Sequence, residues 1–200
     1  MTPHLELLNS ELRDFDLDLS SENKGVLSRY CDELVRWNQK INLTGLAGAD
    51  LVRRLVVEPA WIARELNFFG VLVDIGSGNG SPAIPLHVLS QVEQTHLVES
   101  RAKRAAFLRH VVSTLKLSNV TVHHALFEET VSAFKEPDWI TLQGVALTEQ
   151  LIDSIRSISS STTTVVWITS PAVLPTRIPK KILSVPVTGT QVFLFQLDLS

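Results

Sequence analysis

The sequence has a single cysteine, Cys31, which excludes a disulfide within the chain and a thiolate metal cluster. It also lacks an apolar run of the roughly 20 residues that a membrane span needs, and its first residues lack the basic-then-apolar order of a signal peptide. We therefore expect a cytoplasmic protein with no membrane partner. Cys31 lies among apolar residues of a predicted helix, so we expect it to pack in the core.

An excess of positive charge is also missing. Lysine and arginine number 18 against 21 aspartate and glutamate residues, which gives a net charge of −3 at pH 7. Binding to RNA would therefore depend on local clusters, such as Arg53–Arg54, the segment 101–109, and Arg177 with Lys180–Lys181. An ordinary solvated face is the alternative for each cluster.

The 200 residues suffice for one α/β domain with a substantial core, and we expect a single domain over 1–200. Residues 1–66 place apolar side chains at helical spacing and predict an N-terminal helical region. Residues 67–200 alternate short apolar runs with helical segments, which predicts a mostly parallel sheet covered by helices on both faces. Strands are predicted at 71–75, 95–98, 120–123, 139–142 and 164–168, followed by an antiparallel C-terminal hairpin at 181–185 and 191–197.

The first of these strands runs into a glycine-rich turn, Gly76-Ser77-Gly78-Asn79-Gly80. Ligands bind at the carboxyl ends of strands in an open parallel sheet, and glycines let the backbone approach a ligand that a Cβ would push away. Asp74 can hold the turn or an amino group of the ligand. Glu99, at the end of the next strand, can accept both hydroxyls of a ribose.

The spacing of the glycines discriminates between ligands. Dinucleotide sites use Gly-x-Gly-x-x-Gly, but Ser81 stands where that third glycine would fall, and no Gly-Lys-Ser/Thr ending of a nucleoside-triphosphate loop follows. The pattern favours an adenosyl ligand without a pyrophosphate. A purely structural turn and an oxidoreductase that binds a nicotinamide dinucleotide are the alternatives.

Three stretches resemble the bacterial 16S ribosomal RNA methyltransferase G family (RsmG, also named GidB): WNQKINLT from Trp37, VDIGSGNGSPAIPL from Val73, and LVESRAKRAAFLRHV from Leu97. The resemblance covers about residues 30–129 and implies a Rossmann-like methyltransferase fold. It also implies an enzyme that uses S-adenosylmethionine to methylate N7 of one guanine in 16S ribosomal RNA. We expect a monomer whose partner is this RNA or the small ribosomal subunit.

The resemblance assigns roles to individual residues. It implies that the methionine side of the cofactor is held by Asp74, Gly76, Ser77, Gly78 and Gly80, the ribose by Glu99, and the adenine by Phe127 and Glu128.

Other candidates follow from their place in the sequence. Asn42 is the candidate near the reacting atoms, with capping of the next helix or turn as the alternative. The candidates for binding the substrate are Arg54, Lys103 and Gln143. His123 and His124 have no third ligand at metal spacing, so we expect no metal.

The chain leaves the family pattern where arginines are expected. Leu126, Gln143 and Gln191 stand at these positions, and Arg54 aligns with a histidine. Arginine is the usual bidentate partner of guanine and phosphate, so each lost base contact weakens discrimination by roughly 1–3 kcal/mol. Two alternatives therefore stay open: a paralogue that binds the cofactor but has lost its RNA site, and a methyltransferase with a different acceptor.

Overall fold

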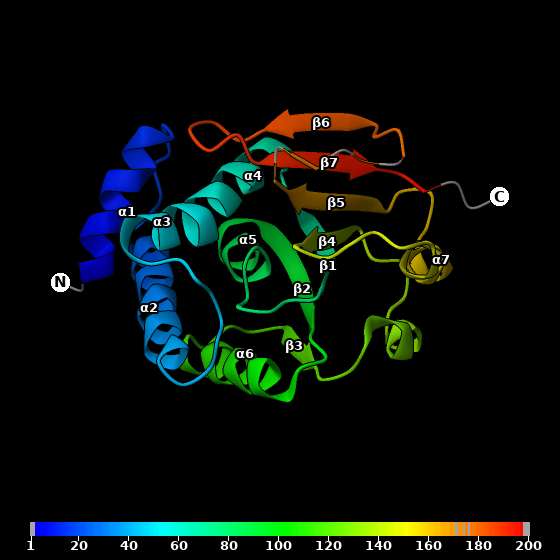
Figure 1. The fold of residues 1–200 in the computed structure, drawn as a ribbon, viewed down its shortest axis with the longest axis horizontal. Coiled ribbons are helices and arrows are strands. Elements are labelled where there is room, and N and C mark those ends of the chain that lie inside the picture. Colours follow the sequence, from blue (N-terminus) through cyan, green and yellow to red (C-terminus); the bar gives the residue numbers. More distant parts are fainter. Residues whose placement is uncertain (1–2, 171, 174, 176, 198–200) are drawn as a thin grey trace.

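The computed structural model describes residues 3–170, 172, 173, 175 and 177–197, which form a seven-stranded sheet with helices on both faces (Figure 1). The α-helices are α1 (Pro3–Asp14), α2 (Ser21–Asn38), α3 (Gly48–Val52), α4 (Glu58–Leu66), α5 (Ala83–Leu89), α6 (Ala102–Thr114) and α7 (Glu149–Ile158). A π-helical turn, η1 (Arg53–Val57), joins α3 to α4, and two 3-10 turns are η2 (Phe127–Glu129) and η3 (Val131–Ala133). The strands are β1 (Phe69–Ile75), β2 (Gln91–Val98), β3 (Val120–His123), β4 (Trp139–Gln143), β5 (Thr164–Thr169), β6 (Lys181–Ser184) and β7 (Gln191–Phe195).

The order of the strands determines where a ligand can bind. The sheet runs β3-β2-β1-β4-β5-β7-β6, with the first five strands parallel and β7 antiparallel to both β5 and β6. The predicted parallel sheet and C-terminal hairpin are confirmed, and the structure adds that β7 lies between β5 and β6. The strand order reverses at β1, so the crevice beyond Ile75 is the expected ligand site.

The N-terminal helices are part of the same packed unit as the sheet. α2 begins after Ser20, whose hydroxyl accepts a 3.1 Å hydrogen bond from the Asn23 amide. Leu34 of α2 is fully buried in one apolar core with Leu72 of β1 and Phe107 of α6. A shared core of this kind supports a single domain.

The opposite face of the sheet has its own core. There α7, η2 and η3 cover apolar side chains of β1, β4 and β5, and α7 lies away from the N-terminal helices (Figure 1). Cys31 packs in the core shared with the N-terminal helices, as predicted, and burial raises the pKa of its thiol to about 12. In the described part of the chain, no helix combines the length and the apolar character needed to cross a membrane.

Leu34→Ala tests whether the helical region and the sheet unfold together. The variant should lose about 2–5 kcal/mol of unfolding free energy, because a cavity opens in the shared core. Circular dichroism and tryptophan fluorescence should report one coincident urea transition. Arg29→Ala, on an exposed position of the same helix, is the control and should change stability by less than about 0.5 kcal/mol. Two separate transitions would contradict the single-domain prediction.

Candidate functional site

The glycine turn needs its glycines for two different reasons. Gly76, Gly78 and Gly80 have φ values of 72°, 51° and 94°, a region that favours glycine. A Cβ on Gly76 would lie 2.7 Å from Cγ2 of Val145, at the wall of the crevice. A Cβ on Gly80 would lie 2.5 Å from Cδ1 of Ile84, so this glycine permits the packing of α5 against the turn. The turn therefore combines ligand access at its start with close helix packing at its end.

Glu99 ties the turn to the neighbouring strand and helix. Its carboxylate is 5% exposed and accepts two backbone hydrogen bonds, from the Gly78 amide at 2.9 Å and from the Arg101 amide at 2.7 Å. Each oxygen keeps a further lone pair, so a ribose hydroxyl could still bind there. Glu99 therefore holds the backbone of the glycine turn and of the start of α6 in place, and it also offers acceptor groups to a ligand.

Asp74 is buried directly before the end of β1, next to the cavities, and has an unsatisfied acceptor. Its Oδ1 accepts a 2.6 Å hydrogen bond from the Thr141 hydroxyl, whereas no described residue donates to its buried Oδ2. Burial raises the pKa of this carboxyl to about 7, against the lowering effects of the Thr141 and Ser77 hydroxyls. A buried acceptor without a donor is destabilising, so the arrangement favours a ligand that brings a positively charged or donating group.

Two cavities meet at the end of β1. One, of about 430 Å³, is lined by the glycine turn, Glu99 and Gln143. The other, of about 300 Å³, is lined by Phe127 and Glu128. Both include Gly76 and Val145 in their walls, so the two cavities adjoin, and we name them together the cofactor cleft. The structure thus brings together predicted cofactor residues from three separate segments of the sequence.

The apolar end of this cleft is backed by aromatic packing. Phe127 is 4% exposed, and its ring stacks on Phe134 with centroids 6.0 Å apart and an interplanar angle of 12°. His123, which we considered as a metal ligand, lies with its Nε2 3.0 Å from Nδ1 of His96. Burial lowers the pKa of both imidazoles. The described residues contain no group of three side chains placed to hold a metal.

Two residues that the sequence analysis missed shape the rim of the cleft. The buried hydroxyl of Tyr30 donates a 2.9 Å hydrogen bond to the Asn79 carbonyl, which joins α2 to the glycine turn. Asn38 accepts from the amides of Leu43 and Thr44 at 2.8 and 3.1 Å and donates to the Thr44 carbonyl at 2.9 Å. Asn38 lies in the WNQKINLT stretch that carries the family resemblance and at the end of a predicted helix, but neither signal assigned it a role.

The loop held by Asn38 carries Asn42. Its side chain is exposed and caps no helix, since α3 begins after Ala47. Its carbonyl accepts a 3.3 Å hydrogen bond from the Arg104 guanidinium. Asn42 therefore does not cap the next helix, and a role near the reacting atoms stays a prediction.

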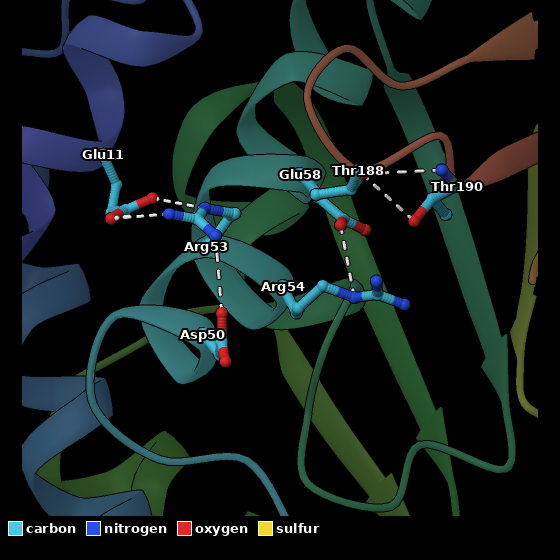
Figure 2. A network of polar contacts seen from close by, with 7 residues as sticks. All are labelled: Glu11, Asp50, Arg53, Arg54, Glu58, Thr188 and Thr190. Carbon is cyan, nitrogen blue, oxygen red and sulfur yellow. Dashed lines mark hydrogen bonds and ion pairs between the residues drawn. The ribbon is translucent and has the colours of Figure 1, made fainter.

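Arg54 lies away from the walls of the cofactor cleft. Its Nε is 3.3 Å from Oε1 of Glu58, and the two lie beneath the turn that carries Thr188 and Thr190 (Figure 2). Glu58 is 1% exposed, and burial raises its pKa, opposed by the hydroxyls of Thr188 and Thr190 and by Arg54. The neighbouring Arg53 pairs with Glu11 at 2.6 Å. Both arginines of the Arg53–Arg54 cluster therefore form ion pairs with carboxylates.

The other two basic clusters differ from each other. Arg177 pairs with Glu149 at 2.6 Å, and Lys180 donates to Gln196 at 2.6 Å. A groove beside the cofactor cleft, in contrast, is lined by a set of basic side chains without a carboxylate within ion-pair distance among the described residues. We name it the cationic groove, and these side chains are Lys40, Arg101, Lys103 and Arg104. Arg101 and Arg104 also line the cofactor cleft, so groove and cleft adjoin.

Comparisons with known proteins agree with this geometry. A family model described as rRNA small subunit methyltransferase G matches residues 23–171. Ribosomal RNA small subunit methyltransferase G of Chloroflexus aggregans is 33% identical over 159 residues, which cover 76% of this chain and 67% of that protein. The protein of the same name from Wolinella succinogenes is 29% identical, over 84% of this chain and 86% of its own length.

Solved structures share the fold. A SAM dependent methyltransferase from Aquifex aeolicus superposes with a TM-score of 0.59 at 11% identity, covering 74% of this chain and 93% of that one. A precorrin-6y C5,15-methyltransferase from Geobacter metallireducens gives a TM-score of 0.52 at 21% identity, covering 68% and 71%. The predicted Rossmann-like methyltransferase fold is confirmed.

Asp74→Asn should weaken binding of S-adenosylmethionine and flatten its pH dependence. A bound ammonium would favour the ionised carboxylate, so wild-type affinity should fall below about pH 7, by up to about tenfold per pH unit. Calorimetry at pH 6 and pH 8 measures this change. Equal affinities for variant and wild type at both pH values would contradict the role of Asp74.

Asp74→Asn should raise the free energy of unfolding at pH 8, although it weakens binding of the cofactor. Because the folded-state pKa is raised from 3.8, the contribution of protonated Asp74 to stability is lost as pH rises through about 7. At pH 8, Asp74→Asn should therefore be more stable than the wild type by roughly 1–4 kcal/mol in urea denaturation. At pH 3 this advantage should disappear.

Proposed function

Because the chain belongs to the rRNA small subunit methyltransferase G family, we propose that it methylates N7 of a guanine in 16S ribosomal RNA with S-adenosylmethionine as methyl donor. The observation that carries this proposal is that two features lie side by side. The cofactor cleft is built with acceptors that suit an adenosyl amino acid, and the cationic groove shares Arg101 and Arg104 with its wall. We also propose that the protein acts as a monomer in the cytoplasm, where ribosomes are assembled.

The residues of the cleft fit the cofactor. The orphaned Oδ2 of Asp74 would accept from the ammonium group, Glu99 from the ribose hydroxyls, and Phe127 and Glu128 would line the adenine. S-adenosylmethionine supplies an electrophilic methyl group when bound. Gly76 and Gly78 keep their side of the cavity free of side chains.

The acceptor atom, guanine N7, has to be positioned for the reaction and does not have to be activated. Guanine N7 carries a free lone pair, so no general base is required and alignment supplies most of the rate. Gln143 lies at the end of β4 and lines the cavity, where its amide could donate a hydrogen bond to guanine O6. An arginine at this position would instead offer a charged group with two parallel donors. Asn42, in the wall of the cationic groove, is our candidate for a second positioning contact.

The cationic groove supports RNA as the substrate. Lys40, Arg101, Lys103 and Arg104 face it without carboxylate partners among the described residues, which leaves their charge available to phosphates. A cofactor-binding protein that had lost its RNA site would not need such a surface. Family membership and the groove both argue against that alternative.

Transfer of tritium from labelled S-adenosylmethionine to undermethylated small ribosomal subunits tests the proposal. We expect incorporation into the 16S RNA, and none at high enzyme concentration would overturn it. Incorporation at an atom other than guanine N7 would instead assign a different acceptor.

The double variant Arg101→Ala/Lys103→Ala should raise KM for the subunits and leave kcat nearly unchanged. Each lost phosphate contact should also reduce the slope of log affinity against log salt by about one. Lys180→Ala is the matched control, because this exposed lysine contacts Gln196 on the C-terminal hairpin. An unchanged KM and salt slope in the double variant would exclude the groove as a phosphate-binding surface.

A further inference from the structure

A pocket beside the cationic groove has an aromatic wall and a basic rim. It measures about 380 Å³ and lies between the end of α2 and α6. Its less polar lining comes from Trp37, Ile41, Ala106 and His110. We name this space the Trp37 pocket.

The indole of Trp37 packs against two other rings. Its ring contacts Phe107 edge-on, with centroids 5.7 Å apart, and His110 at 5.1 Å with an interplanar angle of 42°. Trp37 is half-buried and still lines the pocket, so part of the indole is available to a ligand. A fixed aromatic surface with one accessible side is the usual platform on which unpaired bases stack.

The charges around the pocket suit a ligand that carries phosphates. Arg36, Lys40 and Lys103 line it together with the aromatic groups. An acidic side chain beside the pocket, Glu33, is 2.7 Å from the His110 imidazole and 3.7 Å from the Arg36 guanidinium. Its negative charge is therefore opposed locally, and Lys40 and Lys103 have no carboxylate partner among the described residues.

The Trp37 pocket lies next to the cationic groove, which in turn adjoins the cofactor cleft. Lys40, Ile41 and Lys103 line both the Trp37 pocket and the groove. Arg101 and Arg104 then line both the groove and the cofactor cleft. Basic side chains therefore lie between the two cavities, an arrangement that suits the alternation of bases and phosphates in a single RNA strand.

We propose that the Trp37 pocket binds the base of a nucleotide that flanks the methylated one in an unpaired segment of RNA. The assignment rests on the proposed function, because it adds a second contact to the same substrate. Binding in this pocket would let the enzyme recognise its substrate through base stacking and through the charge of the RNA backbone. Neither contact needs the arginines that Leu126 and Gln143 replace.

Ala106→Trp is designed to fill the pocket. Ala106 is exposed on α6, so a larger side chain there removes no core contact. Ser113→Trp, on an exposed position of the same helix outside the pocket, is the matched control. Ala106→Trp should bind S-adenosylmethionine normally and show about tenfold lower kcat/KM for small subunits, through KM, within the range that loss of one stacked base produces. Ser113→Trp should match the wild type.

Direct binding separates this proposal from the proposed function. The probe is a fluorescently labelled, unpaired oligoribonucleotide that contains the acceptor guanine, read by anisotropy. Wild type and Ser113→Trp should bind it equally, and Ala106→Trp about tenfold more weakly. Replacing the flanking base by an abasic residue should weaken the wild type but not Ala106→Trp.

Equal binding by Ala106→Trp and the wild type would overturn the pocket assignment, whether or not methyl transfer occurs. Absence of transfer by a wild type that shows the binding pattern above would overturn the proposed function and leave the pocket standing.

Discussion

The rest of the site depends on the two backbone hydrogen bonds that the Glu99 carboxylate accepts. By accepting from the amides of Gly78 and Arg101, it fixes the glycine turn against the end of β2 and sets where α6 begins. The turn shapes the cofactor cleft, and the first residues of α6 supply the cationic groove. One buried charge, stabilised by two backbone donors, therefore sets the relative position of the two ligand surfaces.

The distribution of charge explains how an acidic protein can bind RNA. The net charge is −3, and many of the arginines are neutralised, Arg53 by Glu11 and Arg54 by Glu58 among them. The basic side chains of the groove have no described carboxylate within ion-pair distance, so no direct partner compensates their charge. Since exposed charges are screened within about 10 Å at moderate salt, this local arrangement matters more to a phosphate than the overall balance does.

The buried polar groups around the cleft show that binding and stability make opposed demands. Asp74 has a buried oxygen without a donor, and burial raises its pKa to about 7, so the folded protein is less stable for having it. The Tyr30 hydroxyl donates a hydrogen bond to the Asn79 carbonyl and thereby ties the glycine turn to α2. The N-terminal helices are thus part of the site as well as of the core.

The sequence by itself determined the strand pattern, the glycine turn and the paired acidic residues Asp74 and Glu99, because periodicity and glycine spacing are local properties of the chain. Only the tertiary structure decided which of the basic clusters stays unpaired, that β7 lies between β5 and β6, and that Asn38 and Tyr30 hold the rim of the cleft. It also brought Trp37 next to Lys103. These outcomes depend on side-chain contacts between residues far apart in the chain, which the local spacing of residue types did not specify.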